Sequence, residues 1–383
     1  MSKNTNGRVN EYQATGLTTW TFSSVRSAIE QLVLGNFQQP TYLSRAMKMD
    51  GRYAGCVDKR TLGLVQSPVE VNPGIEGDEL AEQAAGLVQE YLERMLPSQE
   101  LRRLVENFHH LSISPATLDW NYSETVWYPA LRTLNPEYTR YDTSNCQWEH
   151  QTRDGITVFK PGDGRWVMFD FWRQGMPSGF VSTLGNAWVR LMYARGDAIE
   201  WNNKHANPKL LAITPMGAEN EDLRSSFVND IAALQNGGVI ECQQDNAGYG
   251  YDVKVLPIPT QGHDSIHKEI DDAVNEITTT VLGVNLTTEV VQGSKAAAET
   301  HYGVQQELVR ADATLLRDVI REQVLRPFIV ANLGHGVPIP WVEWKVGGKS
   351  FQDTVTEKQV EMQEDDNLQQ IKDEPNVVGS NDV

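Results

Sequence analysis

The chain has 383 residues, 40% of them hydrophobic and 22% charged, and its formal net charge at pH 7 is −18. This length is sufficient for two or more domains, each with a buried core. Because DNA phosphates and anionic lipid head groups repel so acidic a protein, the charge excludes tight, non-specific adhesion to nucleic acid or membranes, although it permits proximity to DNA.

Cysteine usage and hydropathy indicate a soluble protein of a reducing, intracellular setting. Cys56, Cys146 and Cys242 are widely spaced and form no C-x-x-C pair, which is typical of proteins without disulfides. No apolar run approaches the roughly 20 residues that a membrane-spanning helix requires. The N-terminal residues also lack the pattern of a signal peptide.

The N-terminal part of the chain alternates between helical and strand-like patterns. Residues 1–20 are polar and rich in Gly, Thr and Asn, so we expect an arm that becomes ordered only against a neighbour. Apolar side chains then recur at helical spacing in four segments. These predicted helices cover residues 23–34, 44–64, 78–95 and 101–111. A strand ending at Pro73 is expected between the second and the third.

Residues 118–180 predict a small antiparallel sheet, because Gly, Pro, Asn and Asp interrupt short alternating runs. Half of the ten tryptophans of the chain lie in this block: Trp120, Trp127, Trp148, Trp166 and Trp172. We expect their rings to be half-buried in a sandwich-like core. An aromatic platform for bases or sugars is the alternative, but the Arg and Lys clusters that it would need are missing.

The next part of the chain predicts a small α/β insert between two helices. The flanking helices are expected at residues 184–204 and 264–282 by their apolar periodicity. Between them, a strand is followed by a helix at 220–235 and by two further strands. Residues 206–259 thus form a compact β-α-β-β unit.

The stretch from Gly283 to Gly334 begins with a small, polar, bendable segment. It then runs from Val304 to Arg326 without a Gly or Pro, and apolar residues recur at steps of four, three, four and four, typical of an amphipathic helix. At 1.5 Å per residue this helix is roughly 35 Å long. Pro327 is expected to kink or stop it. A strand near residues 336–344 and an acidic helix with a tail over 351–383 complete the chain.

Few residues suggest chemistry. His263 and His267 stand four apart on a predicted helix, the spacing of two metal ligands, but no third ligand is in view, and a solvated helix end is favoured. The adjacent His109 and His110 point to different helix faces and suit a shared ligand poorly. Acidic pairs such as Asp271 and Asp272 are expected on exposed helical faces. Since no phosphate-binding or nucleophile motif occurs, we expect no cofactor, no metal site and no enzyme activity.

Residues 267–334 closely resemble the bacteriophage portal proteins of the Mu-like family. The resemblance is carried by a helix ending in Leu-Gly, a Thr-rich loop, and a long helix with a Gly-Ser-Ala start, a central Asp and an Asn near its end. In this chain these positions are Leu282-Gly283, Thr287-Thr288, Gly293-Ser294, Ala296 to Ala298, His301, Asp312 and Asn332-Leu333-Gly334. Upstream, Asp50, Arg60 and Pro73 fill an early family motif. The resemblance covers residues 42–345 more loosely, the helix at 184–204 departs from it, and the chain after Ser350 is short for a full crown.

The resemblance implies an α+β portal fold with a mixed α/β wing, a helical stem, a small α/β clip and a long channel-to-crown helix. After a flexible arm at 1–20, the wing covers 21–183 and regains a strand at 335–350. The stem helices are 184–205 and 262–283, and the clip is 206–261. A channel loop follows at 284–300, a long helix at 301–334, and an acidic C-terminal helix and tail at 351–383 in place of a full crown.

The resemblance also implies a function: a ring at one capsid vertex through which double-stranded DNA is packaged and ejected. The candidate DNA-facing residues of the loop are Thr287, Thr288, Gln292, Ser294 and Lys295. The candidate docking residues of the clip are Asp245, Asn246, Tyr249 and Tyr251. The implied partners are eleven further copies in a dodecamer, the major capsid protein, the terminase large subunit, neck or adaptor proteins and the passing DNA, with no membrane. The virion is the implied location, after assembly in the host bacterial cytoplasm.

Two other functions stay open at this point. A different head-to-tail connector, such as a neck adaptor, would lack a clip between two stem helices. A metal-dependent hydrolase would use His263 and His267.

Overall fold

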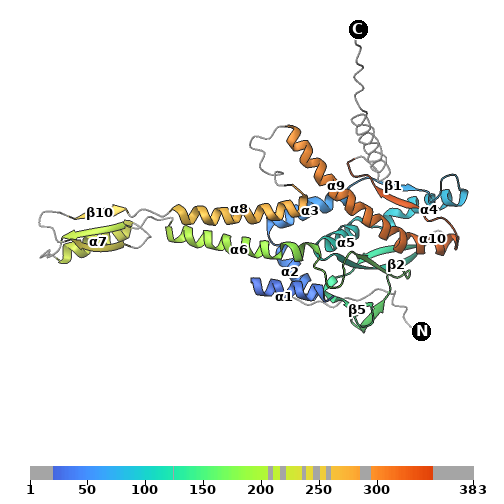
Figure 1. The fold of residues 1–383 in the computed structure, drawn as a ribbon, viewed down its shortest axis with the longest axis horizontal. Helices are drawn as coiled ribbons and strands as arrows, with labels where there is room; N and C mark the ends of the chain where they lie inside the picture. Colours follow the sequence, from blue (N-terminus) through green and yellow to red (C-terminus); the bar gives the residue numbers. More distant parts are fainter. Residues whose placement is uncertain are drawn as a thin grey trace, which may run out of the picture. The chain divides into compact units, whose positions relative to one another are not determined.

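The structure is a computed structural model that describes residues 20–123, 125–205, 210–215, 221–234, 239–244, 251–255, 260–284 and 295–347. The chain divides into two compact units, each described separately below. The first unit comprises Met1–Gly185 and Thr278–Val383, and the second comprises Asn186–Ile277. Mixed helices and strands in both confirm the predicted α+β class (Figure 1).

Helices make up most of the first unit. Its complete helices are α1 (Phe22–Val33), α2 (Gln38–Met47), α3 (Gly51–Val65), α4 (Glu79–Met95), α5 (Ser98–Leu111), α9 (Lys295–Ile320) and α10 (Arg326–Leu333), with a 3-10 turn at Pro136–Tyr138. Two helices pass from one unit to the other: α6 (Gly179–His205) and α8 (Thr260–Leu282). The predicted helices at 23–34, 78–95 and 101–111 are confirmed within a few residues.

The predicted helix at 44–64 is only partly correct, because residues 48–50 divide it between the end of α2 and the start of α3. Between α2 and α3 the backbone turns at Asp50, whose carboxylate accepts hydrogen bonds from the backbone N–H groups of Arg52 and Tyr53, each at 3.0 Å. This is an N-cap, and it starts α3 at Gly51.

Two three-stranded antiparallel sheets replace the single sheet predicted for residues 118–180. One has the strand order β3-β2-β7 and the other β4-β5-β6. Their strands are β2 (Ile113–Ser123), β3 (Val126–Thr133), β4 (Thr139–Asp142), β5 (Gln147–Thr152), β6 (Gly155–Phe159) and β7 (Trp166–Asp170). Trp148, Trp166 and Trp172 are buried rather than half-buried, while Trp127 is 49% exposed.

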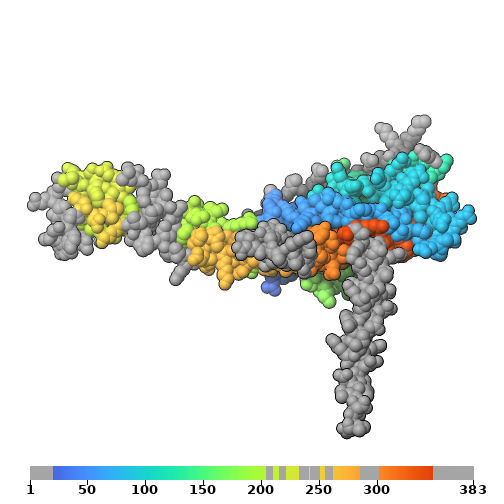
Figure 2. Space-filling model, turned by 90° about the horizontal axis from the view of Figure 1, so that it is seen from above, coloured from blue at the N-terminus to red at the C-terminus, as the bar shows by residue number. Residues whose placement is uncertain are grey.

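A third pairing brings distant parts of the sequence together. Strand β1 (Val69–Asn72) pairs in antiparallel fashion with β11 (Trp341–Trp344), in the register Val69 to Trp344. Figure 2 shows the same proximity, with blue and cyan atoms of the N-terminal half beside orange and red atoms of the C-terminal half. One apolar core joins residues of α4, α5, β2, β7, α9, α10 and β11.

The long C-terminal helix starts earlier than predicted and ends within a residue of the position that the family resemblance implies. It begins at Lys295, since Lys-Ala-Ala-Ala-Glu strongly favours helix, so the last six residues of the expected channel loop are helical. Pro327 does not stop it. Instead, the turn before the proline is π-helical, at Arg321–Leu325, which accommodates a residue without a backbone N–H donor. The helix then continues as α10 to Leu333.

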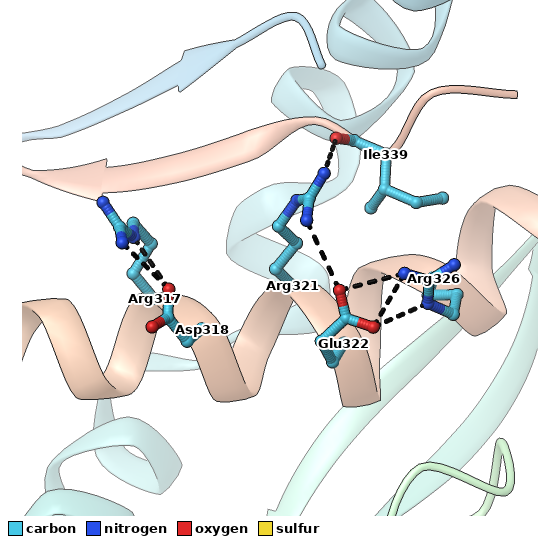
Figure 3. Close-up of polar contacts among 6 residues, drawn as sticks. All are labelled: Arg317, Asp318, Arg321, Glu322, Arg326 and Ile339. Carbon is cyan, nitrogen blue, oxygen red and sulfur yellow. Dashed lines mark hydrogen bonds and ion pairs between the residues drawn. The ribbon is translucent and has the colours of Figure 1, made fainter.

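Around this π turn three arginines pair with acidic side chains, and two of them, Arg317 and Arg321, also lie over the Trp341 ring. Arg317 pairs with Asp318, and Arg326 forms two hydrogen bonds with Glu322 at 2.8 and 2.9 Å (Figure 3). Arg321 donates to the Ile339 carbonyl, and its guanidinium lies 3.7 Å from the centre of the Trp341 ring, a cation–π contact. Arg317 and Arg321 thus attach this part of the helix to Trp341 of β11, while Arg326 pairs within the helix.

Two amide side chains of the long helix bind the two edge strands of the β3-β2-β7 sheet. The Gln323 amide accepts from the backbone N–H of Met168 on β7 at 2.8 Å and donates to its carbonyl at 3.1 Å. The Asn332 amide does the same with Trp127 on β3, at 2.9 and 2.7 Å. Backbone groups of both edge strands are thus satisfied by side chains of one helix, which holds the helix across the sheet.

The second unit contains the predicted β-α-β-β module. Strand β8 (Leu210–Pro215) is central, with β9 (Val239–Gln244) parallel on one side and β10 (Asp252–Val255) antiparallel on the other. Helix α7 (Glu221–Leu234) connects β8 to β9. In the same unit, Arg190 on α6 pairs with Glu269 and Glu276 on α8 at 3.0 and 2.6 Å. The helices predicted on either side of the insert are thus present, each starting a few residues before its predicted position.

Candidate functional site

The segment between α8 and α9 contains most of the predicted DNA-facing residues. Thr287, Thr288, Gln292 and Ser294 lie outside the described residues. Lys295 is the first residue of α9, in a helix rather than in the loop predicted for it. The structure therefore describes the two ends of this segment, the end of α8 and the start of α9, and the end of α8 is packed against α9 and hydrogen-bonded to α3.

The end of α8 rests directly on α9. Gly283 has a φ of +74°, a left-handed conformation that ends the helix. A Cβ atom at this position would lie 3.0 Å from Leu308 Cδ1 and 3.1 Å from Val304 Cγ1. Glycine thus satisfies both the backbone conformation and the close approach. The following residue, Val284, is buried.

A buried ion pair between α3 and α9 also contacts the end of α8. Arg60 on α3 donates from Nε and Nη2 to the two carboxylate oxygens of Asp312 on α9, at 2.7 and 3.0 Å. Its third nitrogen, Nη1, donates to the carbonyl of Val281 at the end of α8, at 3.0 Å. The fork of one guanidinium therefore binds both helices that flank the segment.

His109 on α5 completes this cluster. Its Nε2 lies 2.9 Å from the Asp312 carboxylate, and its Nδ1 lies 3.1 Å from the hydroxyl of Thr61. Because an ionised carboxylate only accepts hydrogen bonds, Nε2 carries a proton. Burial alone would raise the pKa of Asp312, but the hydrogen bonds and charges of His109 and Arg60 lower this pKa below its usual value. The carboxylate is therefore ionised at neutral pH.

Local sequence explains how these side chains meet. The Asp50 cap fixes the start of α3 and so the direction of Arg60. Asp312 lies among Val309, Ala313 and Leu316, which are buried in the core. The Arg60 guanidinium also lies 5.6 Å from the centre of the Phe180 ring. An open hollow of about 380 Å³ borders the cluster, but Arg60, His109 and Asp312 are engaged with one another, an arrangement suited to holding helices rather than to catalysis.

Sequence reasoning named Arg60 and Asp312 as motif positions without predicting that they meet. It considered His109 only as a poor metal ligand and did not predict its contact with Asp312. A usable signal was present. Asp312 falls beside the apolar stripe of its helix, and a carboxylate on a buried face requires a partner.

The second set of predicted site residues belongs to the β-α-β-β module. Asp245, Asn246 and Tyr249 lie outside the described residues. Tyr251, just before β10, is 37% exposed, and its ring lies 5.0 Å from that of Phe227 on α7. It is thus anchored to the module with one side open to solvent.

The alternative metal site gains no ligand. The rings of His263 and His267 lie 4.2 Å apart, and His263 lies 4.8 Å from the ring of Trp201. Within the described residues, no group of three or more His, Cys, Asp or Glu side chains could hold a metal ion. None of the described helices is long and apolar enough to cross a membrane.

Comparison with known proteins gives one family and a set of related structures. The model of the family described as the portal protein of Mu bacteriophage matches residues 42–372. No curated protein matches the chain.

Two solved structures illustrate the likeness. One is a chain from the neck of an empty GTA particle, computed with C6 symmetry, with 13% identity over 95% of this chain and 92% of that chain and a TM-score of 0.51. At this identity the likeness concerns the fold alone. The other is an HK97 family phage portal protein from Corynebacterium diphtheriae, with 8% identity over 79% of this chain and 94% of that chain and a TM-score of 0.42.

Proposed function

Because the chain belongs to the family of the portal protein of Mu bacteriophage, we propose that it forms a ring at one vertex of a phage head, through which double-stranded DNA is packaged and later ejected. The observation that carries this proposal is the family match over residues 42–372. A portal is a structural component of the virion, and in this role the chain itself catalyses no reaction.

The proposal assigns a part to each region of the chain. The mixed α/β wing corresponds to residues 21–183 with 335–350, and the stem to the two helices around the β-α-β-β module. That module is the clip, and residues 284–300 correspond to the channel loop, whose last six residues form the start of α9. The order of elements supports this assignment, because a small α/β module lies between two helices and a long helix follows the loop.

Charge gives the channel its proposed mode of action. Each copy carries a formal charge of −18, and a ring multiplies this charge around the axis. An acidic wall repels DNA phosphates, so the duplex slides instead of binding. Lys295 is the one cation of residues 284–300 and would be the point where the loop attracts the phosphates.

The proposed partners follow from the same assignment. Twelve copies form the ring, and the major capsid protein surrounds it. The clip residues Asp245, Asn246, Tyr249 and Tyr251 would dock the terminase large subunit during packaging and the neck proteins afterwards. Assembly would take place in the cytoplasm of the host bacterium.

Electron microscopy of the purified full-length protein tests this function. We expect rings with a central hole and about twelve-fold symmetry. A protein that stays monomeric at micromolar concentration, or that enters particles only after the head is full, would instead favour a neck adaptor.

A charge reversal tests the loop. We expect Lys295→Glu to reduce the amount of packaged DNA while rings still assemble, because the reversed charge repels phosphates at the constriction. Lys295→Arg, which keeps the charge, is the matched control and should package normally. Unchanged packaging by Lys295→Glu would contradict contact between the loop and DNA.

A further inference from the structure

Arg60 contacts both of the helices that the channel loop connects, α8 and α9. Its bonds to the Val281 carbonyl and to the Asp312 carboxylate, at 2.7 to 3.0 Å, fix the end of α8 against the middle of α9. The Arg60 side chain is only 13% exposed and that of Asp312 only 6%. Because water hardly reaches these groups, the cluster is a fixed joint rather than a surface ion pair.

Beyond this joint α9 stays packed as far as Gln305 and Val309, which are buried, and the turn before Val304 is open. Seventeen residues separate Asp312 from Lys295, which corresponds to about 26 Å of helix. Within this part, Tyr302 is 62% exposed, and a Cβ atom at Gly303 would have no neighbour within 4 Å among the described residues. The Arg60 joint and the packing of Val304 and Leu308 on Gly283 together set the direction of this helix. Over about 26 Å, a change of about 5° in that direction moves the start of α9 by about 2 Å.

We infer that Arg60 is a positioning residue for the channel loop, since it sets the angle between the end of α8 and α9 and so the place where the loop meets its target. The inference rests on the proposed function only in identifying residues 284–300 as the channel loop. Arg60 itself touches no DNA.

The geometry requires an arginine rather than a positive charge alone. Three nitrogens of the planar guanidinium serve three acceptors on two helices. A lysine has one nitrogen on a flexible stem and cannot hold this fork. Arg60→Lys therefore keeps the charge beside Asp312 and loses the fixed angle, which separates positioning from simple charge compensation.

Hydrogen–deuterium exchange on the purified full-length protein tests the joint directly. In Arg60→Lys we expect the amides of residues 295–308 to exchange about tenfold faster or more, as the loss of charge-assisted hydrogen bonds predicts. Amides of α1 and α4 should exchange as in the unchanged protein. Arg102→Lys is the matched control, because Arg102 pairs with Asp58 between α5 and α3 on the surface, and it should leave residues 295–308 unchanged.

Two exchange results would overturn the inference: no acceleration in residues 295–308, or an equal acceleration throughout the first unit, which would indicate general destabilisation. If Arg60→Lys does not fold, the double variant Arg60→Met with Asp312→Leu removes both charges together and avoids an unpaired buried charge. It must show the same local acceleration for the inference to hold.

A packaging assay then relates the joint to the loop. We expect Arg60→Lys to form rings as usual but to package less DNA, and Arg102→Lys to package normally. Normal packaging by Arg60→Lys rings would overturn the role of the joint in placing the loop. If the unchanged protein forms no rings, the proposed function fails, while the exchange experiment still decides whether Arg60 sets the position of α9.

Discussion

The two amides that bind the edge strands should differ in their effect on stability, although they make the same pair of hydrogen bonds. Gln323 binds Met168, which is 1% exposed, whereas Asn332 binds Trp127, which is 49% exposed. We consider the near-isosteric replacements Gln323→Met and Asn332→Leu, which remove the hydrogen bonds while retaining most of the volume.

The structure gives the magnitudes. Met168 lies opposite Pro115 of β2, so its N–H and carbonyl point toward the sheet edge, where Gln323 is their partner. Gln323→Met leaves both groups buried and unsatisfied, at about 1–3 kcal/mol each, or roughly 2–6 kcal/mol in total. At Trp127 water can replace the lost partner, so Asn332→Leu should cost only about 1 kcal/mol.

Urea unfolding followed by tryptophan fluorescence measures both costs, at one protein concentration because assembly shifts apparent stability. Gln323→Glu is the control, since its carboxylate can accept from the Met168 N–H but cannot donate to the carbonyl while ionised. The Gln323→Glu variant should have a lower free energy of unfolding than the unchanged protein. An Asn332→Leu variant that is as unstable as Gln323→Met, or less stable, would refute the reasoning from burial.

Two further predictions concern stability. Gly179→Ala should destabilise the protein by roughly 2–4 kcal/mol, because Gly179 has a φ of +74° and a Cβ atom there would lie 2.4 Å from the carbonyl oxygen of His110. Gly86 lies in the exposed part of α4, where a Cβ atom would have no neighbour within 4 Å among the described residues, so Gly86→Ala should instead stabilise the protein by about 1 kcal/mol. Equal unfolding midpoints for the two variants would contradict this. Burial lowers the pKa of His150 to about 4, whereas the unfolded value is about 6.5. Only the unfolded state takes up this proton between these values, so stability should fall as the pH falls from 6.5 to 4, by roughly 3 kcal/mol from this group. His150→Gln should show a flatter pH dependence of the urea midpoint, and an unchanged slope would argue against it.

Local patterns predicted many of the elements because their causes are local. Helix α4 has an Asp78 cap, acidic residues in its first turn and Pro97 after its end, and each of these signals acts within a few residues. The β-α-β-β module was readable for the same reason. Asp50 shows the limit, because the same residue type can continue a helical pattern or cap a new helix, and the local sequence favoured neither.

Contacts between distant residues could not be predicted in this way. Arg60 and Asp312 are 252 residues apart, and Gln323 and Met168 are 155 apart. Each partner alone looks like an ordinary polar residue on a helix or strand, and only the tertiary fold brings them together. The local pattern left open whether Pro327 kinks or stops the long helix, whereas the family resemblance implied a helix to residue 334. A π turn and the packing of Phe328 and Ile329 in the core outweigh the local cost of the proline.

The most direct test of the portal assignment is a cryo-electron microscopy reconstruction of the purified full-length protein. We expect a closed ring of about twelve copies in which residues 285–294 of every copy line a central channel wide enough for a DNA duplex. A reconstruction without a channel, or one in which these residues lie on the outer surface of the ring, would contradict it.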